Sequence, residues 1–60
     1  MKYTVKNKYG VGKETTHKAV ESALKARDNK KGTGWTVMDT NGNEWDRDFE
    51  GKARISHYAD

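Results

Sequence analysis

The sequence predicts an α+β domain in which a single helix packs on a three-stranded sheet, with the elements in β-α-β-β order. Three patterns lead to this expectation. Apolar and charged residues alternate over residues 1–11, an apolar stripe with helical spacing runs through residues 16–31, and residues 34–50 have the pattern of a β-hairpin. A chain of 60 residues has the size of one small domain, so we treat residues 1–60 as a single unit.

The first predicted strand covers residues 1–11 and has one buried face. Its odd-numbered apolar residues share that face, and its lysines share the other. The apolar set is Met1, Tyr3, Val5, Tyr9 and Val11, and the lysine set is Lys2, Lys6 and Lys8. Glycines at positions 10 and 12 end the strand.

The helix is predicted over residues 16–31. One stripe of the helical surface would pack on the sheet, and it consists of Ala19, Val20, Ala23, Leu24 and Arg27. A threonine at position 15 or 16 can cap the start, and Gly32 suits a left-handed stop after the last turn.

The hairpin is predicted to reverse at residues 39–42, Asp-Thr-Asn-Gly. A type I turn with Gly42 in the left-handed bulge position sets Val37 opposite Trp45, whereas a two-residue loop would set Val37 opposite an acid. Burial therefore favours the bulged turn, and Trp35, Trp45 and Phe49 are predicted to face the helix. For residues 52–60 the pattern leaves a strand through Ala53 and Ile55, or a short helical turn, both open.

The charges predict how the strands are ordered. Residues 1–31 carry nine basic and three acidic side chains, a net +6, and residues 32–60 carry three basic and six acidic, a net −3. Each pair of opposite charges on neighbouring strands is favourable by about a few tenths of a kcal/mol. The first strand is therefore predicted beside the third, in spatial order 1-3-2, with the lysines meeting Glu44, Asp46 and Asp48.

No constellation for catalysis or metal binding is recognised, so we expect a protein that is not an enzyme and needs no cofactor. There is no cysteine, which excludes disulfides and cysteine-based zinc sites. The two histidines, His17 and His57, lack a partner at metal-binding spacing, and the Gly10–Lys13 segment lacks the full spacing of a phosphate loop. No apolar run is long enough for a membrane span, and we expect a cytoplasmic location without membrane contact.

Two kinds of binding surface are predicted. In the first, the outer sheet face and an open edge at the second strand contact another protein or a second copy of the chain; the candidate residues are Lys6, Lys8, Met38, Asp46 and Asp48. The alternative is a nucleic-acid interface on the basic helix and its flanks. Its candidate residues are Lys13, Lys18, Lys25, Arg27, Lys30 and Lys31.

The helix followed by Gly34-Trp35-Thr36-Val37 and the hairpin of residues 39–45 resembles the small β-α-β-β accessory proteins of phages and prophages, and some anti-CRISPR proteins have this size and layout. The resemblance covers residues 3–50 and rests on generic motifs, so no functional residue is carried over. It implies an accessory protein that acts by binding another macromolecule. We expect that macromolecule to be a protein, with a nucleic acid as the alternative.

Overall fold

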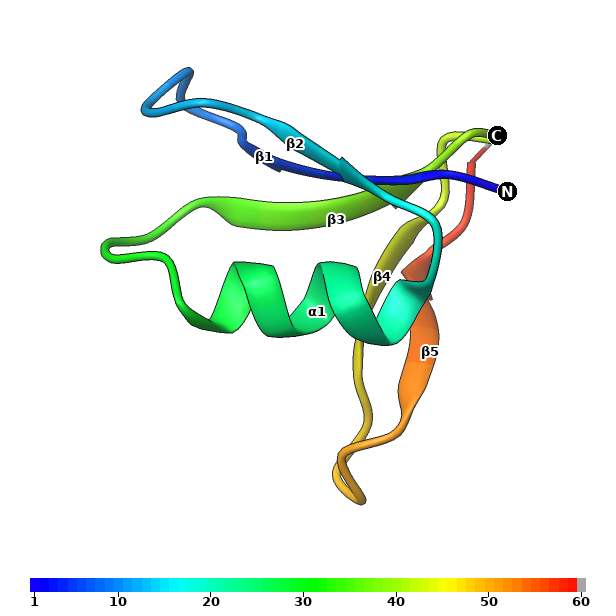
Figure 1. Ribbon diagram of the computed structural model, residues 1–60. Helices are drawn as coiled ribbons and strands as arrows, with labels where there is room; N and C mark the ends of the chain where they lie inside the picture. The colour runs from blue at the N-terminus through cyan, green and yellow to red at the C-terminus, as the bar shows by residue number, and fades with distance from the viewer. Residues whose placement is uncertain (60) are drawn as a thin grey trace.

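The computed structural model describes residues 1–59 and contains one helix packed on a five-stranded antiparallel sheet (Figure 1). The strands lie in the order β2-β1-β3-β4-β5. The elements are β1 (Tyr3–Asn7), β2 (Thr15–His17), α1 (Val20–Asp28), β3 (Trp35–Asp39), β4 (Glu44–Arg47) and β5 (Ala53–His57).

The predicted three-stranded sheet is wrong because two short strands were not assigned. Residues 15–17 form β2, which pairs with β1 as a hairpin, Val5 opposite Thr15. The chain can turn back before β2 because Gly10 and Gly12 have φ angles of 77° and 74°, which glycine adopts freely. The tail adopts the strand alternative as β5, which pairs with β4, Trp45 opposite Ile55. Residue 60 of the predicted tail lies outside the described residues.

The predicted strand order 1-3-2 is also wrong. It places the first strand beside the third predicted strand, which is β4 in the structure. Instead, β1 lies beside β3, the second predicted strand, and Val5 pairs with Val37. Both valines are fully buried against Leu24 of the helix. Burying such a side chain contributes about 1.5–3 kcal/mol, which exceeds the few tenths available from a cross-strand charge pair. Burial of the two valines therefore outweighs the charge pattern on which the prediction relied.

A β-α-β crossover is nevertheless present. It begins at β2, whereas the predicted β-α-β order begins at the first strand. β2 and β3 both run antiparallel to β1, so they are parallel to each other with β1 between them. The helix connects them and covers one face of the sheet (Figure 1). The second predicted strand, which is β3, is therefore a central strand, and the open edge predicted for it is wrong. The edges of the sheet are β2 and β5.

The β3–β4 hairpin has the predicted bulged turn. Val37 lies opposite Trp45, Gly42 has a φ angle of 87°, and its N–H donates to the Asp39 carbonyl at 3.1 Å. The prediction succeeded here because only this register turns both apolar residues to the same face.

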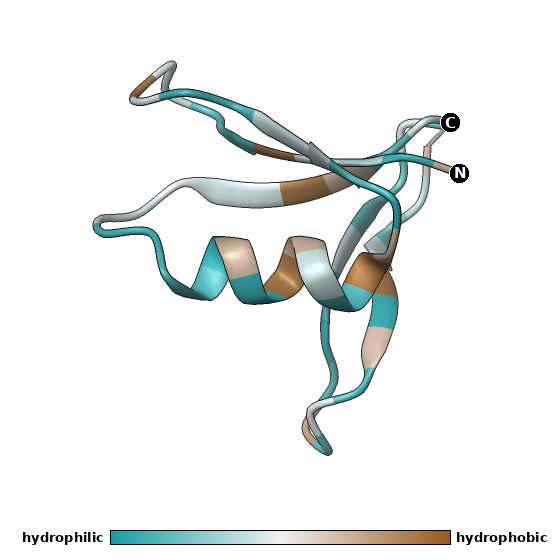
Figure 2. Ribbon diagram, viewed as in Figure 1, coloured by the Kyte–Doolittle hydropathy of each residue, from teal (hydrophilic) through white to brown (hydrophobic). Residues whose placement is uncertain are grey.

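The core is small and lies between the helix and the centre of the sheet, where the apolar bands of β1, β3 and α1 face one another (Figure 2). Its fully buried residues are Val5, Ala23, Leu24 and Val37. Trp35 and Trp45 pack against it as predicted. Met1, Tyr9, Val11 and Phe49 do not, and Phe49 is 97 % exposed.

These four misplaced side chains lie beyond the ends of the strands, Met1 before β1 begins. The period-2 pattern was extended past Asn7, where β1 ends, and past Arg47, where β4 ends. The helix is likewise shorter than the predicted 16–31, because residues 15–17 belong to β2 and the chain leaves the helix after Asp28. Within residues 1–59, the helix is too short to cross a membrane.

Candidate functional site

Two loops that are far apart in the sequence meet at one end of the molecule. They are the β1–β2 loop, residues 8–14, and the α1–β3 loop, residues 29–34 (Figure 1, left). The Lys8 N–H donates to the Gly34 carbonyl at 2.8 Å, and the Asn7 side-chain amide donates to the Thr33 carbonyl at 2.9 Å. These hydrogen bonds fix the two loops to each other.

Glycine makes the close approach of the loops possible. A Cβ atom at Gly34 would lie 2.6 Å from Cδ2 of Tyr9, and one at Gly12 would lie 2.9 Å from the Trp35 ring. Both distances are shorter than a side chain can tolerate, so each aromatic ring lies directly against the backbone of the opposite loop. The two loops thus form one continuous surface.

Five lysines gather on or beside these loops, and we call this surface the lysine end. It consists of Lys6, Lys8, Lys13, Lys30 and Lys31. Residues 6–13 and 29–35 contain no acidic side chain. The rest of the chain holds the other seven of the 12 basic residues and all nine acidic ones, so the net charge of +3 conceals a concentration of positive charge at one end.

Aromatic rings lie among these lysines. The Lys8 ammonium is 5.4 Å from the centre of the Tyr9 ring, and the Lys30 ammonium is 4.9 Å from the centre of the Trp35 ring. Both distances are within the range of a cation–π interaction. The Trp35 indole N–H also donates to the Lys31 carbonyl at 3.0 Å, which holds the α1–β3 loop over this ring.

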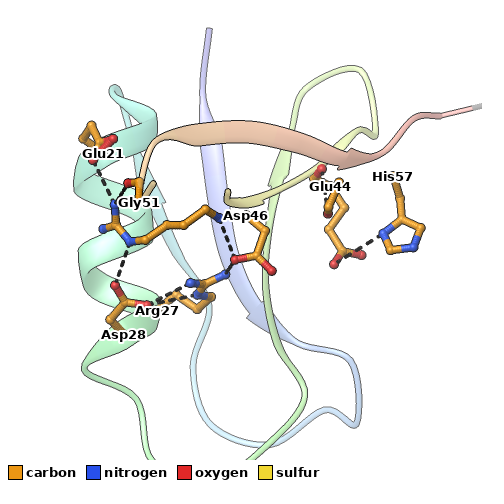
Figure 3. Close-up of polar contacts among 9 residues, drawn as sticks. Glu21, Arg27, Asp28, Glu44, Asp46, Gly51 and His57 are labelled. Carbon is orange, nitrogen blue, oxygen red and sulfur yellow. Dashed lines mark hydrogen bonds and ion pairs between the residues drawn. The ribbon is translucent and has the colours of Figure 1, made fainter. Parts of the chain in front are cut away.

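Two predicted site residues instead belong to an ion-pair network between the helix and β4 (Figure 3). Arg27 donates to Asp46 at 2.6 Å and to Asp28 at 2.9 Å. Arg47 contacts Asp28 at 3.1 Å and Glu21 at 3.3 Å. Arg27 is therefore engaged by two carboxylates of its own chain, and Asp46 by Arg27.

The pKa values reflect this pairing. Burial is the largest single influence on Asp46 and opposes its ionisation, but the hydrogen bonds from Arg27 and from the Arg47 N–H, together with the charge of Arg27, outweigh burial and hold its pKa below the usual value. The hydrogen bond from Arg27 is likewise the main reason that the pKa of Asp28 is lowered. Because these groups stabilise one another, Arg27 and Asp46 fit a role in attaching β4 to the helix.

The other predicted residues are also dispersed. Asp48 is part of the β4–β5 turn, where its carboxylate accepts the N–H groups of Glu50 and Lys52 at 2.9 Å each. Lys18 lies before the helix, at the opposite end from Lys30 (Figure 1), and Lys25 is exposed on the helix itself. The predicted nucleic-acid set is thus brought together only in part, through Lys13, Lys30 and Lys31.

Over β2, β1 and β3, the open face of the sheet, opposite the helix, is mostly uncharged. One row across the strands consists of Thr16, Thr4, Met38 and Glu44, and a second pairs Lys6 with Thr36. Met38 alternates with buried Val37 and so lies on this face, half-buried among its neighbours. The predicted rows of lysines opposite carboxylates do not form, because β4 is not a neighbour of β1.

Neither histidine belongs to a recognisable reactive group. His17 shares a hydrogen bond with Thr15 of the same strand at 2.9 Å and another with Ser22 at 3.3 Å, and the second connects β2 to the helix. His57 lies on β5, and its Nδ1 atom is 3.9 Å from Oε2 of Glu44 on β4 (Figure 3). Among residues 1–59 there is no group of three side chains suited to hold a metal ion, and no pocket.

The lysine end was missed as a unit because its two halves are separated by the helix in the sequence. Lys6 and Lys8 were assigned to the sheet face and Lys13, Lys30 and Lys31 to the helix surroundings. The available signal was the set of glycines close to both lysine groups: Gly10 and Gly12 lie between Lys8 and Lys13, and two more glycines follow Lys31 at positions 32 and 34. Comparison of the chain with protein-family models, curated proteins and solved structures finds no match.

Proposed function

We propose that the protein is a small non-enzymatic binding module whose lysine end binds the phosphate backbone of a nucleic acid. The observation that carries this proposal is the convergence of five lysines on or beside two loops joined by hydrogen bonds, in which Glu14 at the end of the β1–β2 loop is the one acidic residue. Lysines release condensed counterions when they neutralise phosphates, and that release drives binding.

The surroundings of the lysine end support the same reading. Apart from Glu14, the nearby carboxylates contact Arg27 and Arg47 between the helix and β4. Within residues 1–59, the five lysines form no ion pair, and Lys8 and Lys30 contact aromatic rings. Aromatic rings among basic side chains are typical of surfaces that bind nucleic acids.

The test is fluorescence anisotropy with labelled oligonucleotides of mixed sequence at several salt concentrations. For contacts by three to five lysines, the slope of log K against log salt should be about −2 to −3.5 on single strands. The double variant Lys30→Ala/Lys31→Ala should reduce the size of that slope by about 1.4 and weaken binding at low salt.

The matched control is Lys18→Ala/Lys25→Ala, which has the same net charge but changes two exposed lysines outside the lysine end. It should bind nearly as well as the parent protein. If both double variants lose affinity equally, only the net charge matters and the proposed site is wrong. If the parent protein does not bind at low salt, the proposed function is wrong.

Contact with another protein is the second candidate, and Phe49 favours it. This side chain is 97 % exposed at the tip of the β4–β5 turn. The turn is held by Asp48, which accepts two backbone N–H groups, and by Arg47, which donates to the Gly51 carbonyl at 3.1 Å. A ring presented on a fixed turn between Asp48 and Glu50 suits an apolar pocket with a basic rim.

This candidate is tested by affinity capture from the native host, followed by mass spectrometry. A partner that uses Phe49 should be retained by the parent protein, lost with Phe49→Ala and retained with Lys52→Ala, an exposed neighbour in the same loop. A protein retained equally by all three chains does not use this turn, which would contradict the assignment.

A further inference from the structure

We infer that the lysine end selects single-stranded over duplex nucleic acid, because the exposed ring of Tyr9 stacks on an unpaired base. This inference rests on the proposed function and adds the substrate class. A base within a duplex has both faces covered by its neighbours, whereas a single strand can offer a base to an aromatic side chain.

Tyr9 is exposed but not loosely held. Its side chain is 68 % exposed, yet its backbone N–H donates to the Asn7 side chain at 2.8 Å. The edge of its ring lies against the Gly34 backbone, in the space that any larger residue would fill. The ring is therefore presented in a defined position, which lowers the entropy lost when a base stacks on it.

One lysine lies over this ring, and two more belong to the loop whose backbone touches it. The Lys8 ammonium lies 5.4 Å from the ring centre on a flexible side chain, and it can turn toward the phosphate of a base that stacks there. Lys30 and Lys31 approach from the second loop, whose Gly34 contacts the ring. Stacking and phosphate neutralisation can thus act on the same strand.

Trp35 has a different position and is not expected to stack. Its ring is half-buried, with the Gly12 backbone against one edge, Lys30 over its face and its N–H bonded to the Lys31 carbonyl. Trp35 instead fixes the loop that carries these two lysines. Tyr9 is the more exposed of the two rings, and it can meet a base when the Lys8 side chain turns away from its face.

The experiment compares oligo(dT) and oligo(U) with a duplex of equal phosphate number by fluorescence anisotropy. Both single strands should bind more tightly than the duplex. Tyr9→Ala should weaken single-strand binding by about 5- to 150-fold, the range measured for the loss of one stacked base, and leave the salt slope unchanged. Tyr9→Trp should restore the affinity, which a merely structural role for Tyr9 would not predict.

Tyr58→Ala is the matched control, because Tyr58 is 76 % exposed and lies after β5, away from the lysine end (Figure 1). It should bind as the parent protein does, and circular dichroism should show that each variant is folded. Equal affinity for duplex and single strands, with no effect of Tyr9→Ala, would overturn this inference and leave the proposed function standing. No binding to any of the oligonucleotides would overturn both.

Discussion

Asp39 is the polar residue on which the β3–β4 turn depends. It is almost buried, and its carboxylate accepts the N–H groups of Asn41 and Asn43 and the Trp45 indole N–H, each at 2.9 Å. The Trp45 hydrogen bond is the largest cause that lowers its pKa, and the bonds from Asn43 and Asn41 add to it, bringing the pKa from 3.8 to about 2. The ionised form is therefore stabilised by folding.

This pKa predicts how stability depends on pH. A carboxylate with a lowered pKa in the folded state contributes stability that is fully present above its unfolded pKa near 3.8 and is lost as the pH falls toward about 2. Urea midpoints should therefore fall over that range. Asp39→Asn should be less stable at pH 7 and show a flatter profile, because its amide has one oxygen in place of two and cannot accept all four N–H groups that the Asp39 carboxylate accepts. An unchanged profile in the variant would contradict this role.

The close contact between the two loops of the lysine end requires glycine at position 34. Gly34→Ala places a Cβ 2.6 Å from Cδ2 of Tyr9, whereas Gly10→Ala meets nothing within 4 Å. Both glycines have positive φ angles, 90° and 77°, so both variants incur the strain of about 1–2 kcal/mol that alanine has in this conformation. Gly34→Ala should therefore destabilise the protein more than Gly10→Ala in urea unfolding, and equal losses would show that Tyr9 does not lie on Gly34.

At the scale of elements, the sequence predicted the helix and strands whose apolar residues lie on one face. It misassigned the elements that lack such a pattern. The Asp39–Gly42 turn and its register followed from burial of Val37 and Trp45. The short β2 did not, because threonine favours both a helix cap and a strand, and nothing in Thr15-Thr16-His17 alone distinguishes the two. Pairing with β1 decides it, and that pairing is a tertiary contact.

The helix stabilises the sheet mainly through Leu24, which is fully buried between β1 and β3. Leu24→Ala should cost about 2–5 kcal/mol. A domain of this length has a total stability of roughly 3–9 kcal/mol, so the variant should be largely unfolded at modest urea concentrations. Lys25→Ala, on the exposed side of the same helix, should change stability by less than about 0.5 kcal/mol. Similar losses in the two variants would contradict the assigned core.

At the scale of the whole molecule, charge was the pattern most open to misreading. The excess of basic residues in the first half predicted a sheet with lysines opposite carboxylates. In the structure, Arg27 and Arg47 pair with acids between the helix and β4, and five lysines collect at the end where two loops meet. The sequence could identify Lys13, Lys30 and Lys31 as candidates, but joining them to Lys6 and Lys8 required the strand order.

The most direct test of the lysine end is to map binding residue by residue. Proton–nitrogen correlation NMR spectra of the labelled protein, titrated with oligo(dT), report on every backbone N–H group. We expect the largest shifts within residues 8–13 and 29–34, moving together at one affinity, and little change in the β3–β4 and β4–β5 turns. Shifts centred on the row of Thr4 and Met38, or on the turn around Phe49, would contradict the assignment of the two joined loops as the binding surface.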